Sequence, residues 1–117
     1  MDFEPYLAAW HQRSERQREQ TALAVSRAMT VARHLAHILV ERYFATRVLL
    51  VGSLARGEFG ARSDIDLAVA GVPPGDFFRA GAELEREARG FEVDLIPLES
   101  ANAFFLQQVS RDGVALP

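Results

Sequence analysis

Residues 47–70 read RVLLVGSLARGEFGARSDIDLAVA, and this stretch decides how the chain folds. Residues 47–51 form a nearly continuous, partly β-branched apolar run, which is typical of a buried strand. Gly52 ends that run, and a short helix is expected at residues 54–56 before a Gly-rich polar loop. Residues 64–70 are a second mostly apolar run. The stretch therefore predicts two strands joined by a turn and a loop.

Two carboxylates alternate with apolar side chains at the start of the second expected strand. Successive side chains on a strand point to opposite faces, so Asp64 and Asp66 point the same way, with Cα atoms about 6.6–7 Å apart. Mg²⁺ prefers carboxylate and phosphate oxygens, and ion pairs that catalyse displacement at phosphorus lie about 3.5–4 Å apart. The two carboxylates can therefore bind one pair of divalent cations, although an Asp-x-Asp taken alone is more often a solvated strand end.

A third carboxylate interrupts the strand expected at residues 91–97. Asp94 lies among apolar residues, where a charge is costly unless it is paired, hydrogen-bonded or bound to metal. If this strand lies beside the second one, Asp94 joins Asp64 and Asp66, and a metal relieves their repulsion. Asp94 is then also placed to accept a proton from an attacking hydroxyl. The alternative is that Asp94 shares a wet face of an edge strand with Glu92.

The turn after the first strand carries groups that bind phosphate. Gly52 lets the backbone turn and lets a phosphate approach closely, and Ser53 offers a hydroxyl and an N–H at a helix N-terminus. Arg56 and Arg62 lie in the same loop and are candidates to hold a leaving pyrophosphate. Each residue alone is more often a turn or surface residue; together with the aspartates they favour a metal–nucleotide site.

Composition excludes several other kinds of site. The net charge of −3 provides no general attraction for nucleic acid or for an anionic membrane surface, so neither is expected as a partner. The absence of cysteine excludes disulfides and thiolate chemistry. All thirteen basic residues are arginine, which excludes the phosphate loop that requires lysine. The N-terminus lacks the pattern of a signal peptide, so a cytoplasmic protein is expected.

The remaining elements alternate helices with short strands. Helices are expected at residues 6–44, at 76–89 with Asp76 as N-cap, and at 100–109 with Ser100 as N-cap. The pairs Phe77-Phe78 and Phe104-Phe105 on the two later helices are expected in the core, and residues 114–116 add a last extended piece. This order predicts one α+β domain in which a small sheet is packed with helices.

The N-terminal third divides into three parts. Phe3, Tyr6, Leu7 and Trp10 form an apolar stripe, residues 11–20 contain no apolar residue, and a helical stripe resumes at Ala22. An unbroken helix would be about 60 Å long, so either the chain breaks within residues 11–20 or its first part projects. Residues 1–26 are therefore predicted to be a helical extension and residues 27–117 the domain. The stripe either folds back on the domain or docks on a partner or a second protomer.

The motifs together resemble those of the minimal nucleotidyltransferases of the DNA polymerase β superfamily. The signature of that family is Gly-Ser, ten residues, then Asp-x-Asp, and this chain has Gly52-Ser53, residues 54–63, then Asp64-Ile65-Asp66. Val93-Asp94-Leu95 is similar to the family's third carboxylate segment. The resemblance covers roughly residues 30–117 and implies a mixed sheet packed with helices.

The resemblance also implies a reaction and a partner. Asp64 and Asp66 would hold two Mg²⁺ ions, and Asp94 would complete the catalytic metal site. Minimal members of the family are commonly antitoxins that transfer AMP from ATP to a tyrosine of a HEPN ribonuclease toxin, here expected as a separate chain. Two alternatives remain: transfer to a small molecule such as an aminoglycoside, and an antitoxin that neutralises the toxin by binding alone.

Overall fold

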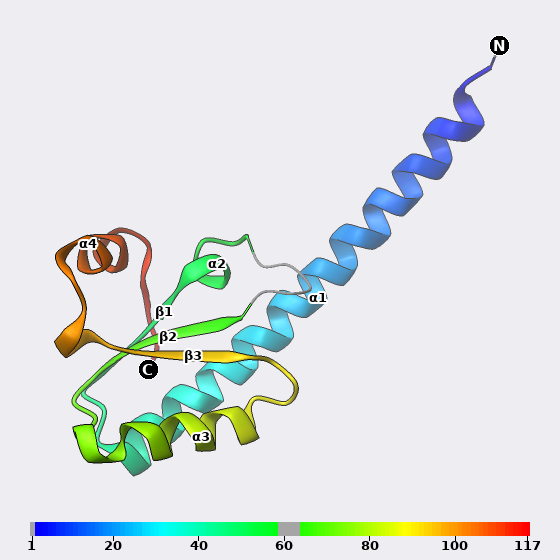
Figure 1. Ribbon diagram of the computed structural model, residues 1–117. Coiled ribbons are helices and arrows are strands. Elements are labelled where there is room, and N and C mark those ends of the chain that lie inside the picture. Colours follow the sequence, from blue (N-terminus) through cyan, green and yellow to red (C-terminus); the bar gives the residue numbers. More distant parts are fainter. Residues whose placement is uncertain (1, 59–63) are drawn as a thin grey trace.

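The fold is a four-stranded sheet with helices on both faces. The computed structural model describes residues 2–58 and 64–117. The elements are α1 (Glu4–Tyr43), β1 (Arg47–Val51), α2 (Gly52–Ala55), β2 (Ile65–Ala70), α3 (Phe77–Glu87), β3 (Val93–Pro97), α4 (Ala103–Asp112) and β4 (Val114–Ala115), with 3₁₀ turns at Pro74–Asp76 and Leu98–Ser100. The predicted α+β class, a small mixed sheet packed with helices, is confirmed (Figure 1).

The sheet has the strand order β3-β2-β1-β4. β1 pairs antiparallel with both β2 and β4, whereas β2 and β3 pair in parallel. The parallel pair needs a crossover connection, and α3 provides it between the end of β2 and the start of β3. As a result, the first residues of β2 and β3 lie at the same edge of the sheet.

The alternation of side chains along β1 divides the core between the two faces. Val48 and Leu50 belong to the larger cluster, which α1 and α3 cover, and Leu35 and Leu84 are fully buried in it. Leu49 and Val51 point to the other face and pack in a smaller cluster with residues of β2 and α4. One face of the sheet is thus covered by the main core, and the other face is covered only in part by α4.

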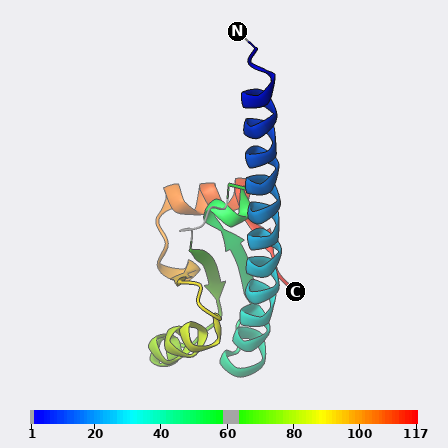
Figure 2. The ribbon, with the colours of Figure 1, turned by 90° about the vertical axis from the view of Figure 1, so that its right-hand side faces the viewer.

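Helix α1 is continuous over 40 residues, so the break considered within residues 11–20 does not occur. Its C-terminal half packs on the sheet, while its N-terminal part projects beyond the domain (Figures 1 and 2). Every residue from 2 to 23 is exposed except Ser14, which is half-buried. The alternative in which the stripe of Phe3, Tyr6 and Trp10 folds back onto the domain is therefore wrong. In the described residues no helix combines the length and apolarity that crossing a bilayer requires.

Two helix starts differ from the sequence-based expectation. The last helix begins at Ala103, and Asn102 caps it by accepting a hydrogen bond from the N–H of Phe105 at 2.8 Å. Ser100 instead closes a 3₁₀ turn in which the Glu99 carboxylate accepts a bond from the N–H of Gly71. Asp76 lies at the N-cap position of α3, but its side chain makes no capping bond. The last helix therefore begins later than expected, at an asparagine that is as favourable an N-cap as serine.

The expectation that all four paired phenylalanines lie in the core is half wrong. Phe78 and Phe104 are 89% and 68% exposed, whereas Phe77 and Phe105 pack against the two clusters. Adjacent residues on a helix point about 100° apart, so a pair of large neighbours cannot both face the same sheet. The helical period decides which member of each pair is buried.

Leu35→Ala is expected to lower the free energy of unfolding by about 2–5 kcal/mol, because Leu35 is fully buried under the sheet. The matched control is Leu23→Ala on the same helix, where the leucine is 52% exposed and the expected loss is below about 0.5 kcal/mol. Urea unfolding of both variants measures the difference. Equal losses would show that the projecting part of α1 is packed in solution.

Candidate active site

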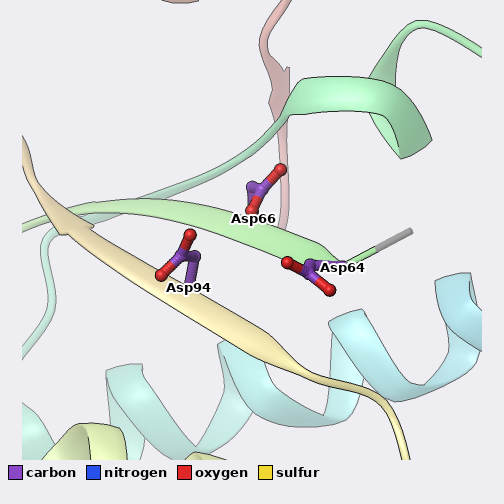
Figure 3. Close-up of side chains that lie close together, drawn as sticks. All are labelled: Asp64, Asp66 and Asp94. Atoms are coloured by element: carbon purple, nitrogen blue, oxygen red, sulfur yellow. The ribbon is translucent and has the colours of Figure 1, made fainter. Parts of the chain in front are cut away.

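Three carboxylates meet where the parallel strands begin. Asp66 of β2 and Asp94 of β3 are register partners, and Asp64 precedes β2 by one residue. Each offers an oxygen, and these oxygens all lie within 4.8 Å of one another (Figure 3). Asp64 and Asp66 are half-buried, and Asp94 is exposed. The predicted convergence of the three aspartates is confirmed as geometry, because β3 lies beside β2 in parallel.

Gly52 approaches the cluster so closely that only glycine fits. Val51 pairs with Asp66 across the antiparallel strands, which brings the next residue against that carboxylate. A Cβ built on Gly52 would lie 2.2 Å from Oδ2 of Asp66, and Gly52 has a φ of +75°. Both the contact and the backbone angle require the absence of a side chain. The turn that the sequence predicts is therefore also the wall of the carboxylate cluster.

The electrostatics of the cluster are unfavourable without a cation. Burial raises the pKa of Asp66, repulsion from Asp94 and Asp64 raises it further, and attraction to Arg56 only partly offsets these effects. Arg56 is already within 3.2 Å of Glu58, although both side chains are largely exposed. An exposed pair of this kind is weak, so Arg56 can turn to another anion. The cluster has the donor set and the excess negative charge of a divalent-cation site.

The carboxylates separate two hollows that differ in charge. One is a cavity of about 110 Å³ lined by Gly52, Arg56 and Asp66 together with α4 residues. The other, of about 410 Å³, is lined by Asp64, Asp94 and Glu85 together with residues 90–93. Arg56 is the one cation among the described residues that line either hollow, and it shares the smaller hollow with the carboxylates of Asp66 and Asp112.

The structure places most, but not all, of the predicted phosphate-binding residues. Ser53 is half-buried in the first turn of α2, directly after Gly52, and Arg56 follows that helix as its C-cap. Arg62 lies outside the described residues. Gly52 and Arg56 thus border the carboxylates, and Ser53 lies on the same turn.

Residues that sequence reasoning missed line both hollows. Phe105, Gln108 and Asp112 of α4 border the smaller one, and Glu85 and Phe91 border the larger one. Nothing in their local sequence marks them, because their place depends on how α3 and α4 pack on the sheet. The nearest signal was the helical period of α4, on which Phe105, Gln108 and Asp112 follow at i, i+3 and i+7 and so share one face.

The fold is that of a nucleotidyltransferase domain. The family model described as Polymerase beta, Nucleotidyltransferase matches residues 33–116, and the chain belongs to this family. Comparison with curated proteins gives no match. Residues 1–32, which include the projecting part of α1, lie outside the matched region.

Solved structures of the same fold include one described as a minimal nucleotidyltransferase. It is 28% identical to this chain, with a TM-score of 0.66, and the match covers 79% of this chain and 95% of that one. A toxin–antitoxin complex with AMP-PNP is 24% identical (TM-score 0.58; 80% and 72% covered). A complex of a tri-AMPylated Shewanella oneidensis HEPN toxin with an MNT antitoxin is 23% identical (TM-score 0.50; 83% and 71% covered). At these sequence identities, the two toxin–antitoxin complexes show only that they share the fold of this chain.

Gly52→Ala is expected to abolish metal-dependent activity and to destabilise the protein by at least about 1 kcal/mol, because the new methyl group displaces Asp66. Gly57→Ala is the matched control, since Gly57 has nearly the same φ of +74° but open space around its Cβ position. The control therefore isolates backbone strain, and it should leave divalent-cation binding unchanged. Calorimetric titration with Mg²⁺ compares the two variants; equal losses would contradict the steric role of Gly52.

Asp66→Asn is expected to stabilise the metal-free protein at pH 7. The raised pKa means that the native state holds a proton that the unfolded chain releases above about 3.8, so the free energy of unfolding falls as pH rises from there through the native pKa. The variant lacks this loss, so its Tm should exceed that of the wild type at pH 7, and the difference should shrink towards pH 4.

The same thermal scans test the cation. Added Mg²⁺ should raise the Tm of the wild type at pH 7 and have little effect on Asp66→Asn, because ligand binding to the native state stabilises it. Asp76→Asn, a carboxylate outside the cluster, serves as the control and should respond to Mg²⁺ as the wild type does. If the metal-free Asp66→Asn variant has a lower Tm than the wild type at pH 7, the charge of Asp66 does not destabilise the native state.

Proposed function

We propose that this chain is an Mg²⁺-dependent nucleotidyltransferase that transfers AMP from ATP to a tyrosine of a separate HEPN ribonuclease toxin and thereby acts as its antitoxin. The observation that carries the proposal is the convergence of Asp64, Asp66 and Asp94 within 4.8 Å beside Gly52. We also propose, from the sequence, that the protein is cytoplasmic.

The carboxylate cluster fits a pair of Mg²⁺ ions. It offers hard oxygen ligands from three side chains, and burial and repulsion from Asp94 and Asp64 raise the pKa of Asp66, a cost that a bound cation would relieve. Asp64 and Asp66 would hold both ions, and Asp94 would complete the site of one. When bound, the ions neutralise the triphosphate and stabilise charge that develops during in-line displacement.

The residues of the Gly52 turn would bind the triphosphate. Gly52 keeps the wall of the site free of a side chain, and Ser53, in the first turn of α2, would offer its hydroxyl and N–H. Arg56, which exchanges its weak contact with Glu58 for a phosphate oxygen, would hold the leaving pyrophosphate. The same role for Arg62 rests on the sequence motif.

The acceptor would approach from the opposite side of the cluster. The hollow lined by Asp64 and Asp94 has no cation among its described lining residues, so it repels phosphate and admits a neutral hydroxyl. Asp94 is exposed there and can take the proton as the hydroxyl oxygen bonds to the α-phosphorus and the bond to pyrophosphate breaks. A tyrosine side chain is long enough to reach into such a recess from the surface of a partner.

The choice of acceptor rests on the family resemblance and on structures of the same fold. One such structure is a complex with AMP-PNP, and another contains an AMPylated HEPN toxin with its MNT antitoxin. Neutralisation by binding alone would leave the three-carboxylate cluster without a role.

Incubation with Mg²⁺, ATP labelled on the α-phosphate and the co-encoded HEPN protein tests the proposal. Label is expected on a tyrosine of the HEPN protein, and Asp66→Ala should reduce its rate by at least about 10²-fold, the scale of losing one charge-stabilising group. Asp76→Ala, which removes a carboxylate outside the site, should transfer normally.

Two results would point elsewhere. A HEPN protein that stays unlabelled, yet is neutralised equally by the wild type and by Asp66→Ala, would establish occlusion instead of catalysis. Label that appears on aminoglycosides and not on the HEPN protein would establish a small-molecule transferase.

A further inference from the structure

The projecting part of α1 carries an apolar stripe that no described part of the chain covers. We call residues 4–23 of α1 the arm, and Tyr6, Leu7 and Trp10 the arm stripe. These three side chains are 73%, 53% and 56% exposed, and Phe3, just before the helix, is 59% exposed. The arm extends the molecule to 67 Å in its longest dimension, against 30 and 20 Å in the others.

The arm stripe continues the face by which α1 packs on the sheet. Eighteen residues make five full turns of an α-helix, so residues 18 apart point in the same direction. Tyr6, Leu7 and Trp10 therefore point the same way as Ala24, Val25 and Ala28. Ala24 and Val25 pack against the core, and Ala28 is buried in it. The arm stripe thus faces the side of α1 on which the domain lies, and it continues that face beyond the end of the sheet.

The arm stands beside the end of the sheet that carries the carboxylates. Figure 1 shows α1 rising obliquely past the region where α2 lies and β2 begins. Figure 2 shows the sheet, α2 and α4 on one side of α1, with the arm continuing beyond them. Trp10 lies about 27 Å along the helix from Ala28 at 1.5 Å per residue. A molecule seated over the carboxylates would therefore lie in the angle between the catalytic face and the arm.

We propose that the arm stripe docks the protein acceptor of the nucleotidyl group and holds its acceptor hydroxyl over the carboxylate cluster. The inference rests on the proposed function and deepens it, because it makes the acceptor a folded protein that contacts two surfaces of this chain. A small acceptor that fills only the recess beside Asp94 would not reach the arm.

Buried area favours this occupant over a second copy paired through the arm. The aromatic side chains of Phe3, Tyr6 and Trp10 bury about 450–750 Å² at 150–250 Å² each, which is less than the roughly 800 Å² per partner of a stable interface. The arm alone is therefore too small an interface, whereas the arm and the catalytic face together are not. The arm carries three arginines and three glutamates and so has no net charge. The acceptor surface over the arm stripe is accordingly apolar.

The test compares two sets of exposed apolar residues on the same helix. Tyr6→Ala/Trp10→Ala removes the arm stripe, and Leu23→Ala is the control. Leu23 is 52% exposed and lies 13 residues from Trp10, about 220° round the helix, on the opposite face. Alanine is the best helix former, so α1 remains intact. Circular dichroism and Tm should therefore be unchanged in both variants.

Binding and turnover are measured separately with the co-encoded HEPN protein. The double variant should bind it at least tenfold more weakly by calorimetry and raise its KM by a similar factor, while kcat stays within about twofold. Transfer to a short tyrosine peptide should proceed equally in all three proteins, because a peptide cannot reach the arm. Leu23→Ala should match the wild type throughout.

Unchanged affinity and KM in the double variant would overturn the inference, as would a wild type that does not bind the HEPN protein. So would a wild-type dimer that the double variant dissociates without loss of HEPN affinity, since the stripe would then serve self-association. Failure of the proposed function looks different: the wild type would bind without labelling. In that case a tenfold weaker double variant would still support docking through the arm.

Discussion

The parallel pairing of β2 with β3 is the constraint on which the site depends. Their register sets Asp66 opposite Asp94, and parallel strands begin at the same edge, so Asp64 joins them. The antiparallel pairing of β1 with β2 then brings Gly52 against Asp66 from the other side. A shift of one residue in either pairing would turn the carboxylates to the opposite face. Two strand registers therefore position the three acidic side chains and the turn beside them.

The fold stabilises a cluster that electrostatics alone would disperse. Burial, together with repulsion from Asp94 and Asp64, raises the pKa of Asp66, and this cost opposes folding near neutral pH. The large cluster between the sheet, α1 and α3 compensates, because its leucines are almost fully buried. Stability is thus concentrated on one face of the sheet, which leaves the other face available for a charged site.

Helix α1 stabilises the core and also extends beside the candidate site. Its C-terminal half packs on the sheet, and the same helical face continues into the arm without a partner among the described residues. The family match begins at residue 33, so the arm is an addition to the shared domain. The apolar stripe of the arm points the same way as the buried face of α1. The arm therefore lies beside any molecule that occupies the site. This geometry makes the arm a candidate determinant of which acceptor the domain modifies.

Local sequence determined the elements and most of the site. The apolar runs at residues 47–51 and 64–70 predicted β1 and β2, because buried strands require such runs, and period two placed Asp64 and Asp66 on one face. Motif spacing identified the Gly52 turn and Asp94 as members of the same site. Helix ends were less predictable, since Ser100 and Asn102 are both competent caps and their surroundings chose between them.

Only the tertiary structure decided what depends on residues distant in sequence. The approach of Gly52 to Asp66 and the two unlike hollows arise from strand pairing and from the packing of α3 and α4, which no local pattern encodes. The course of residues 11–20 was also undecided, because a polar helix and a polar loop have similar compositions. Continuity of α1 follows from a core that anchors its C-terminal half, so each further turn adds hydrogen bonds without a new nucleation step.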